Sequence, residues 1–142
     1  MDSEGSIDVL NRLLTIEMRS LPMYLVNTSS WDDPHNEAAV QTIIHTAEDQ
    51  QAMASRVARL IQMREGAVVV GEFPMAYTDL NFLSLDFLLR RLVAAQRGDV
   101  EAVRRCVEEL DNDPIARELA EEILGAEKAH LEAFEELVAQ HA

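Results

Sequence analysis

Apolar residues recur every three or four positions along most of the chain, which is the spacing of amphipathic α-helices. The first such segment runs from about Ile7 to Thr28. Pro22 should bend this helix, because proline removes one backbone donor. One face of the segment carries Leu10, Leu14, Glu17, Leu21 and Tyr24.

A polar stretch, residues 27–33, separates this segment from a second helix. Asp33 followed by Pro34 is typical of a helix N-terminus, with a capping carboxylate and a proline in the first turn. The second helix is expected to end at Gly66, as glycine commonly follows a helix C-terminus. The first two helices should therefore form a hairpin.

A third helix is expected to begin near Thr78 and Asp79, and its dense leucine face comprises Leu85, Leu88, Leu89 and Leu92. Gly98-Asp99 predicts a break or kink, followed by a re-capped piece to Leu110. The residues 112–114, Asn-Asp-Pro, then predict the N-terminus of a fourth helix that reaches nearly to the C-terminus.

The connection between the second and third helices, AVVVGEFPMAY, decides the topology. At 1.5 Å per residue a helix of about thirty residues is roughly 45 Å long, and about a dozen extended residues cover roughly 40 Å. The connection can therefore run back along the bundle and set the second and third helices parallel, whereas a short loop would give a plain up-down-up-down bundle.

Composition agrees with this pattern. The chain has 142 residues, of which 48% are hydrophobic and only 5% aromatic, which favours an all-α fold in a single domain, residues 1–142. The net charge of -14 and the scattered basic residues exclude a phosphate-following surface, so neither nucleic acid nor an anionic membrane is an expected partner.

The N-terminal residues MDSEGSID carry acids where a signal peptide would carry lysine or arginine, and no apolar stretch reaches the ~20 residues of a membrane span. A cytoplasmic protein is expected. Cys106 is the only cysteine, so it has no partner for an internal disulfide and should be a small buried hydrophobe.

Two ionisable residues of the fourth helix point at its apolar face. Glu127 and His130 lie one turn apart among Leu119, Ile123 and Phe134, close enough to hold one cation. A buried carboxylate needs a proton, a charged partner or a metal. Glu17 has the equivalent place on the first helix and is the natural third ligand. The alternative is a buried pair of Glu17 and His130, with Tyr24 and glutamines hydrogen-bonded around it.

Two segments carry a resemblance to a known family. The stretch LNRLLTIE, residues 10–17, with Tyr24 seven residues after Glu17, resembles the first helix of bacterioferritins and related ferritin-like proteins such as rubrerythrins. The stretch EILGAEKAHL, residues 122–131, resembles their fourth helix. In that family two helices each give a glutamate and two give Glu-x-x-His around a dinuclear iron centre. The resemblance implies Glu17, Glu127 and His130 as ligands of iron or another divalent metal.

The second helix departs from the family pattern, because no register gives Glu-x-x-His. One register places Ala47 and Gln50 at the ligand positions, another Gln50 and Met53, and a third Glu48 and Gln51, although Glu48 then lies off the apolar face. His45 points further from that face, as a solvated histidine would. Glu48, Gln50 and Gln51 are therefore the weaker candidates.

The third helix offers no glutamate on its leucine face. Asp86 flanks that face as another weak candidate, and Gln96 lies on it as a polar neighbour of the interior. The carboxylate for a second iron is thus missing. Methionine usually fills cores, and no methionine stands at the family's axial position, so haem is not expected; the three methionines considered are Met18, Met53 and Met63.

Three functions follow. The first is a ferritin-like bundle with an incomplete dinuclear iron site, which binds one metal ion or none and acts in binding or assembly, with enzymatic activity left open. The second is a di-iron protein that oxidises or stores Fe(II), in which Tyr24 tunes the site or donates an electron. The third is a metal-free structural or partner-binding bundle.

A homodimer through the faces of the first two helices is expected, with an unidentified protein partner left open. Dimerisation would cover apolar surface such as Met18, Leu25 and Val68-Val69-Val70.

Overall fold

The computed structural model describes residues 3–28, 37–80 and 84–140, and these residues form helices without any β-strand. The predicted all-α class is confirmed. The elements are α1 (Ser3–Met18), α2 (Leu21–Thr28), α3 (Glu37–Met63), the 3-10 helix η2 (Met75–Leu80), α4 (Leu85–Glu109) and α5 (Pro114–Gln140). No described helix combines the length and apolar character that a membrane span requires.

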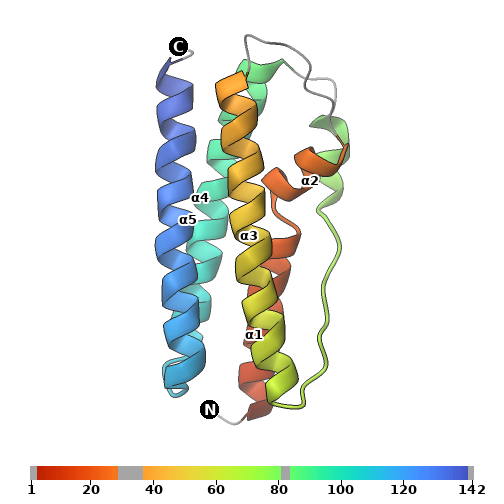
Figure 1. Cartoon of the computed structure of the whole chain (residues 1–142), viewed down its shortest axis with the longest axis vertical. Coiled ribbons are helices and arrows are strands. Elements are labelled where there is room, and N and C mark those ends of the chain that lie inside the picture. Colours follow the sequence, from red (N-terminus) through yellow and green to blue (C-terminus); the bar gives the residue numbers. More distant parts are fainter. Residues whose placement is uncertain (1–2, 29–36, 81–83, 141–142) are drawn as a thin grey trace.

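The long connection between α3 and α4 climbs the full height of the bundle, so that α3 and α4 run parallel while α1 and α5 run the opposite way (Figure 1). The predicted crossover is confirmed. Two side chains that lie one turn apart on α1 hold the backbone of this connection in place. Asn11 Nδ2 donates to Ala67 O (2.9 Å), Asn11 Oδ1 accepts from Val69 N (2.8 Å), and Thr15 Oγ1 accepts from Gly71 N (3.0 Å).

The apolar core lies in two halves. One half joins the start of α1 and the end of α3 to the lower parts of α4 and α5, and includes Leu10, Leu13, Ile61 and Ile123. The other half joins α2 to the opposite ends of α3, α4 and α5, and includes Leu25, Ile43, Leu89 and Phe134. On each of the long helices a buried polar residue falls between these two halves, namely Glu17, Gln50, Gln96 and Glu127. The bundle therefore has a polar layer at its middle.

The first predicted helix is two helices, because the chain breaks at Arg19-Ser20. Ser20 Oγ accepts a hydrogen bond from Met23 N (3.2 Å), and Pro22 lies in the first turn of α2. Pro22 cannot donate to a carbonyl of the preceding turn, and the Ser20 hydroxyl offers a new cap, so the chain restarts rather than bends. α2 leaves the bundle axis at this point (Figure 1).

The end of α3 lies three residues before the predicted Gly66. Gly66 N bonds to Ile61 O and Glu65 N to Gln62 O, both at 2.9 Å, which is a Schellman motif. The left-handed residue of this motif is Glu65, with φ 59°. The predicted cap of the second helix, Asp33-Pro34, lies outside the described residues.

Two predictions for α4 are wrong. The helix begins at Leu85 rather than near Thr78, with Ser84 Oγ accepting from Phe87 N (3.4 Å), because residues 75–80 form η2 instead. There is also no break at Gly98, since α4 continues to Glu109. Gly98 faces open space, and its cost of about 1 kcal/mol in a helix is offset by the core packing of Val100 and Val103 on the same helix.

The start of α5 is tied to the end of α3. Asp113 caps α5, since its Oδ1 accepts from Ala116 N (3.3 Å), as predicted for residues 112–114. The same carboxylate pairs with Arg64, whose Nη2 lies 2.9 Å from Oδ1. Arg64 holds the pKa of Asp113 well below its usual range, by hydrogen bonding and by charge.

Candidate functional site

Each of the four long helices places one fully buried polar side chain in the middle layer of the bundle. These are Glu17 of α1, Gln50 of α3, Gln96 of α4 and Glu127 of α5. Half-buried Asp49 and Asp99 and the less exposed His130 lie around them. We call these seven residues the central cluster.

Glu127 is the hub of the central cluster. Its Oε2 accepts hydrogen bonds from Gln50 Nε2 and from Gln96 Nε2, each at 3.0 Å, and Gln96 Nε2 also donates to the Glu127 carbonyl at 3.0 Å. Its Oε1 has no hydrogen-bond partner among the described residues. Burial raises the pKa of Glu127, although the Gln50 amide, His130 and the Gln96 amide oppose that rise.

Ser20 fixes the orientation of the Gln50 amide. Because Ser20 Oγ accepts the Met23 N–H, its own proton is free to go to Gln50 Oε1, 2.6 Å away. The Gln50 carbonyl is thereby engaged, and its NH₂ group faces Glu127. Because Ser20 lies at the break between α1 and α2, this break determines that Gln50 of α3 turns its NH₂ group toward Glu127.

Glu17 has no hydrogen-bond donor for either carboxyl oxygen within the described part of the chain. Burial raises the pKa of Glu17 well above its ordinary value, and the charges of Glu127, Asp99 and Asp49 raise it further. Both causes favour the protonated form of Glu17.

Asp99 extends the central cluster toward the crossover. Burial, and then the charge of Glu127, raise the pKa of Asp99 to about 7, and its Oδ2 is buried without a partner in the described residues. Tyr77 of η2 responds to the same carboxylate, since burial and Asp99 raise the pKa of Tyr77 to about 12.

His130 joins the buried part of the cluster to the surface. Its Nε2 lies 2.7 Å from Asp49 Oδ2 on α3 and 3.6 Å from Glu127 Oε1 on its own helix. The side chains are 40% exposed for Asp49, 17% for His130 and 1% for Glu127. The three residues therefore form a path from solvent to the core.

The sequence as a whole agrees with this geometry. A model of the ferritin-like domain matches residues 7–141. The chain belongs to the ferritin-like family. No curated protein sequence gives a significant match.

Compared with the di-iron members of the ferritin-like family, the central cluster lacks half of the acidic ligands. That pattern takes a glutamate from each of two helices and Glu-x-x-His from each of the other two. Here α1 gives Glu17 and α5 gives Glu127 and His130, but α3 presents Gln50 with Met53 three residues later. Helix α4 presents Gln96. Gln50 belongs to two of the three registers that the sequence left open, whereas Glu48 and Gln51 of the third register are exposed.

The residues of the central cluster do not provide the ligands that two iron ions need. Bridging two metals takes shared carboxylates, yet the amides of Gln50 and Gln96 direct N–H groups at Glu127 Oε2, and an N–H cannot coordinate a metal. As the side chains lie, no three histidine, cysteine, aspartate or glutamate residues of the described chain converge tightly enough to hold a metal ion.

The other weak candidates lie apart from the central cluster. Glu48 and Gln51 are exposed and line a surface groove of about 430 Å³ between α2 and α3, where Glu48 approaches His45 at 3.9 Å. Asp86 is exposed in the first turn of α4, where an acid favours the helix dipole. It precedes Gln96 by ten residues, or about 15 Å of helix.

Tyr24, the predicted auxiliary residue, packs against the crossover. Its ring lies 5.4 Å from that of Phe73 and 5.8 Å from that of Tyr77, measured between centroids. Leu25 is fully buried and so contributes nothing to an apolar surface, contrary to expectation.

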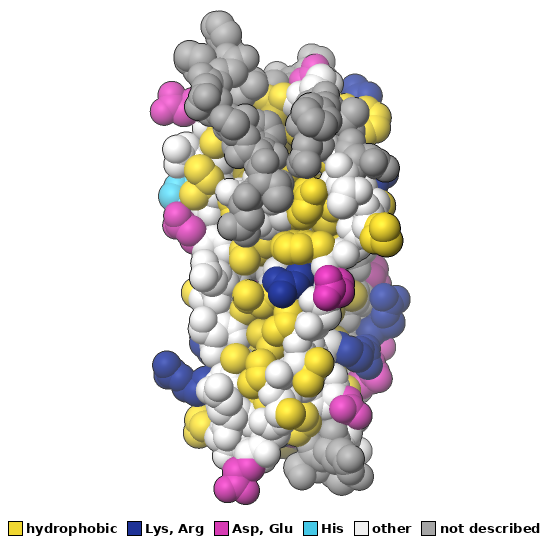
Figure 2. All heavy atoms as spheres, turned by 90° about the vertical axis from the view of Figure 1, so that its right-hand side faces the viewer, with side chains coloured by type: hydrophobic (Ala, Val, Ile, Leu, Met, Phe, Trp, Pro, Cys, Tyr) yellow, Lys and Arg dark blue, Asp and Glu magenta, His cyan; other side chains and the backbone are white. Residues whose placement is uncertain are grey.

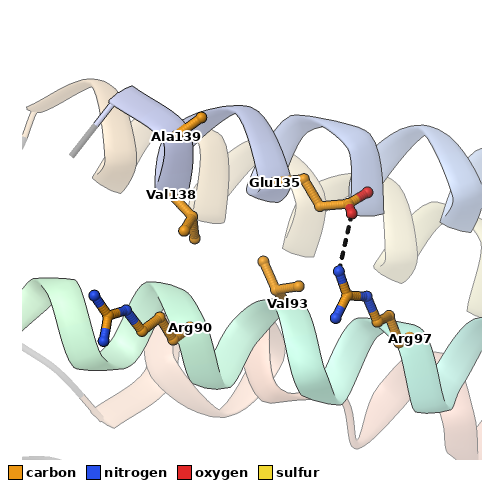
Figure 3. Close-up of a pocket in the computed structure, with 6 residues that line it drawn as sticks. All are labelled: Arg90, Val93, Arg97, Glu135, Val138 and Ala139. Atoms are coloured by element: carbon orange, nitrogen blue, oxygen red, sulfur yellow. Dashed lines mark hydrogen bonds and ion pairs between the residues drawn. The ribbon is translucent and has the colours of Figure 1, made fainter. Parts of the chain in front are cut away.

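A groove of about 460 Å³ between α4 and α5 is separate from the central cluster (Figure 3). Val93 and Val138 face each other in it, Arg90 lies toward one end, and Arg97 pairs with Glu135 at 3.1 Å toward the other. None of its lining residues belongs to the cluster.

Sequence reasoning missed Ser20, Asp49 and Asp99. Asp99 follows Gln96 by three residues, the same spacing that links Glu127 to His130, and this was the available signal. It was overlooked because Gly98-Asp99 was interpreted as a helix break. Asp49 gave no signal, since only the position of α5 beside α3 brings it to His130.

Proposed function

We propose that this protein is a ferritin-like bundle that binds a single divalent cation through Glu17, Glu127 and His130, and that it acts in binding or assembly rather than as an iron oxidase. The observation that carries the proposal is the set of buried carboxyl oxygens without donors, namely both oxygens of Glu17 and Oε1 of Glu127.

Such oxygens are costly unless a proton, water or cation satisfies them. No lysine or arginine of the described residues forms an ion pair with the cluster, since their pairs all lie elsewhere. Two carboxylates and an imidazole form a donor set that suits Zn²⁺, Mn²⁺ or Fe²⁺. One bound cation would supply the positive charge that the cluster lacks.

Gln50 and Gln96 also limit the site to a single cation. Gln50 and Gln96 are neutral, and their amide protons already satisfy Glu127 Oε2. The chain's own residues thus hold one ion within the polar layer. They offer no second carboxylate bridge for dioxygen chemistry on two metals.

The test is a titration of metal-free protein with Zn²⁺ by calorimetry, with His130→Ala and the matched control His45→Ala. We expect one Zn²⁺ per chain for the wild type, an unchanged isotherm for His45→Ala, and at least tenfold weaker binding for His130→Ala. Two ions per chain would contradict the proposal, as would the absence of any binding.

A metal-free structural bundle is the second candidate, and one observation favours it. The amides of Gln50 and Gln96 and the side chain of Asp49 already provide Glu127 and His130 with protein partners. In that case, replacing Glu17 and His130 together by apolar residues would leave stability unchanged or improved.

A further inference from the structure

The crossover runs beside α1 as an extended segment over residues 66–73 (Figure 1). In such a segment, the N–H and C=O groups of alternate residues point to opposite sides. On one side the Asn11 amide spans Ala67 O (2.9 Å) and Val69 N (2.8 Å), as a residue of a neighbouring parallel strand would. One edge of the crossover is therefore paired as in a β-sheet, with helix side chains in place of a strand.

The same edge stays on α1 over the next two turns of the helix. Gly71 N donates to Thr15 Oγ1 (3.0 Å), and Arg19 Nε donates to Gly71 O (2.8 Å). Asn11, Thr15 and Arg19 follow each other at about 6.0 Å along the helix, which nearly matches the roughly 6.6 Å of two extended residues. A Cβ at Gly71 would lie 3.1 Å from Thr15 Cγ2, so the backbone lies close against α1. These contacts hold the crossover in an extended form.

The opposite edge of the crossover is open. The backbone N–H and C=O groups of Val68, Val70 and Glu72 have no hydrogen-bond partner in the part of the chain that the structure describes. Figure 1 shows the crossover as the outer border of the molecule on this side. Consecutive valines favour extended pairing, and a row of unpaired N–H and C=O groups is a template for another strand. We call these backbone groups the open edge.

We propose that the open edge pairs with the same edge of a second copy of this chain, as an antiparallel two-stranded sheet centred on Val70. In this register Val70 lies opposite Val70 of the partner subunit, and Val68 lies opposite Glu72 of the partner subunit. Each of these pairs exchanges two N–H···O bonds, and the interface has twofold symmetry. This pairing is independent of whether the central cluster holds a cation.

Charge favours a second copy at this place and in this register. The net charge of -14 makes two copies repel each other over most of their surfaces. Residues 66–78 carry only one charged side chain, that of Glu72, although 27% of the whole chain is charged. A parallel pair would place the two Glu72 side chains directly opposite each other. The antiparallel pair separates them by about 13 Å along the strands, which exceeds the Debye length of about 8 Å.

The surroundings of the open edge also favour pairing. Val68 is 39% exposed and Val69 60% exposed, so a second copy would remove apolar surface from water. A two-stranded sheet is marginally stable by itself. Here each strand is already ordered on α1, so association does not have to order either strand.

Amide hydrogen exchange of the full chain, followed by NMR, tests both edges at once. The amides of Val69 and Gly71 should be protected through their bonds to α1. We expect the amides of Val68, Val70 and Glu72 to be protected at least tenfold as well, although their own described chain offers them no partner. Exchange of these three amides at the rate of an unstructured peptide would overturn the proposal, even for a protein that sediments as a dimer.

A pair of variants at one position separates backbone pairing from side-chain contact. Val68→Pro removes an N–H donor from the open edge and none from the edge on α1, whereas Val68→Thr changes the same side chain and keeps the donor. We expect sedimentation to give a dimer dissociation constant at least tenfold higher for Val68→Pro than for Val68→Thr. Equal constants, or a monomeric wild type, would overturn the proposal. If Val68→Pro loses the protection of Val69 and Gly71, the exchange pattern of the wild type decides alone.

Discussion

At the scale of single residues, the central cluster has more acceptors than donors. Five of its buried oxygens lack a donor in the described chain, and they belong to Glu17, Gln96, Asp99 and Glu127. The amides of Gln50 and Gln96 both donate to one oxygen of Glu127, and His130 pairs with Asp49. The cluster is therefore built to hold positive charge, as protons or as a cation.

Asp99→Asn should remove part of the pH dependence of the free energy of unfolding. The pKa of Asp99 is about 7 in the fold, above its unfolded value, so the folded chain binds more protons between about pH 4 and pH 7. This contribution is fully present below the unfolded pKa and is lost as pH rises through 7. Without added metal, we expect urea denaturation to show Asp99→Asn more stable than wild type by on the order of 2 kcal/mol at pH 8 and nearly equal at about pH 4.

Asp113 does not interfere with this test. Its pKa is lowered by Arg64, so its stabilising contribution is present above the unfolded pKa and disappears only as pH falls below about 4. An equal effect of Asp99→Asn at both pH values would show that Asp99 does not titrate in this window.

The sequence predicted those site residues whose place depends on one helix alone. Glu17, Glu127 and His130 follow from the apolar stripes of their own helices. Gln50 appeared in two of three registers, because α3 carries small residues such as Ala47 and Ala54 on its buried side and its stripe is weakly marked. Asp49 depends on how two helices lie together, which periodicity does not determine.

At the scale of elements, the hydrogen-bond partners available to backbone groups, rather than glycine alone, decide where these helices begin and end. Ser20 accepts the Met23 N–H and separates α1 from α2, whereas Gly98 sits within an unbroken α4. Sequence patterns gave the number and order of the long helices because core stripes extend over many turns. The same patterns did not predict where a helix is interrupted, because an interruption depends on which backbone groups find new hydrogen-bond partners.

Glu65→Gly should stabilise the end of α3. Glu65 has φ 59°, where a Cβ is strained and glycine is not. We expect a gain of about 0.5–1 kcal/mol in the free energy of unfolding, measured by urea denaturation. Gly66→Ala is the contrasting variant and should destabilise, since a Cβ there would lie 2.7 Å from Ile7 Cδ1. A loss of stability in Glu65→Gly would contradict the assignment of Glu65 as the left-handed residue.

At the scale of the whole molecule, the crossover determines the topology and also shapes one outer face. Its length allowed the parallel arrangement of α3 and α4 to be predicted from the sequence. Hydrophobic side chains run along this face of the molecule, with charged ones mostly toward its edges (Figure 2). Val69 is 60% exposed and Met75 86% exposed.

We expect a homodimer that covers this face together with the neighbouring surface of α1 and α3. Sedimentation at micromolar concentration should give a dimer for the wild type and a monomer for Val69→Asp combined with Met75→Asp. Ile115→Asp is the control, since Ile115 is 67% exposed but lies in the first turn of α5. A wild-type protein that sediments as a monomer would rule out this interface.

We propose that this ferritin-like bundle holds one cation because the neutral side chains of Gln50 and Gln96 replace carboxylates that a dinuclear site needs, and because Met53 follows Gln50 at the spacing where Glu-x-x-His has its histidine. The most direct measurement is the number of Fe²⁺ ions per chain after anaerobic loading and desalting, for the wild type and for Gln50→Glu combined with Met53→His and Gln96→Glu. We predict one ion for the wild type and two for the triple variant. Two ions in the wild type would contradict the account, because residues other than these would then complete the site.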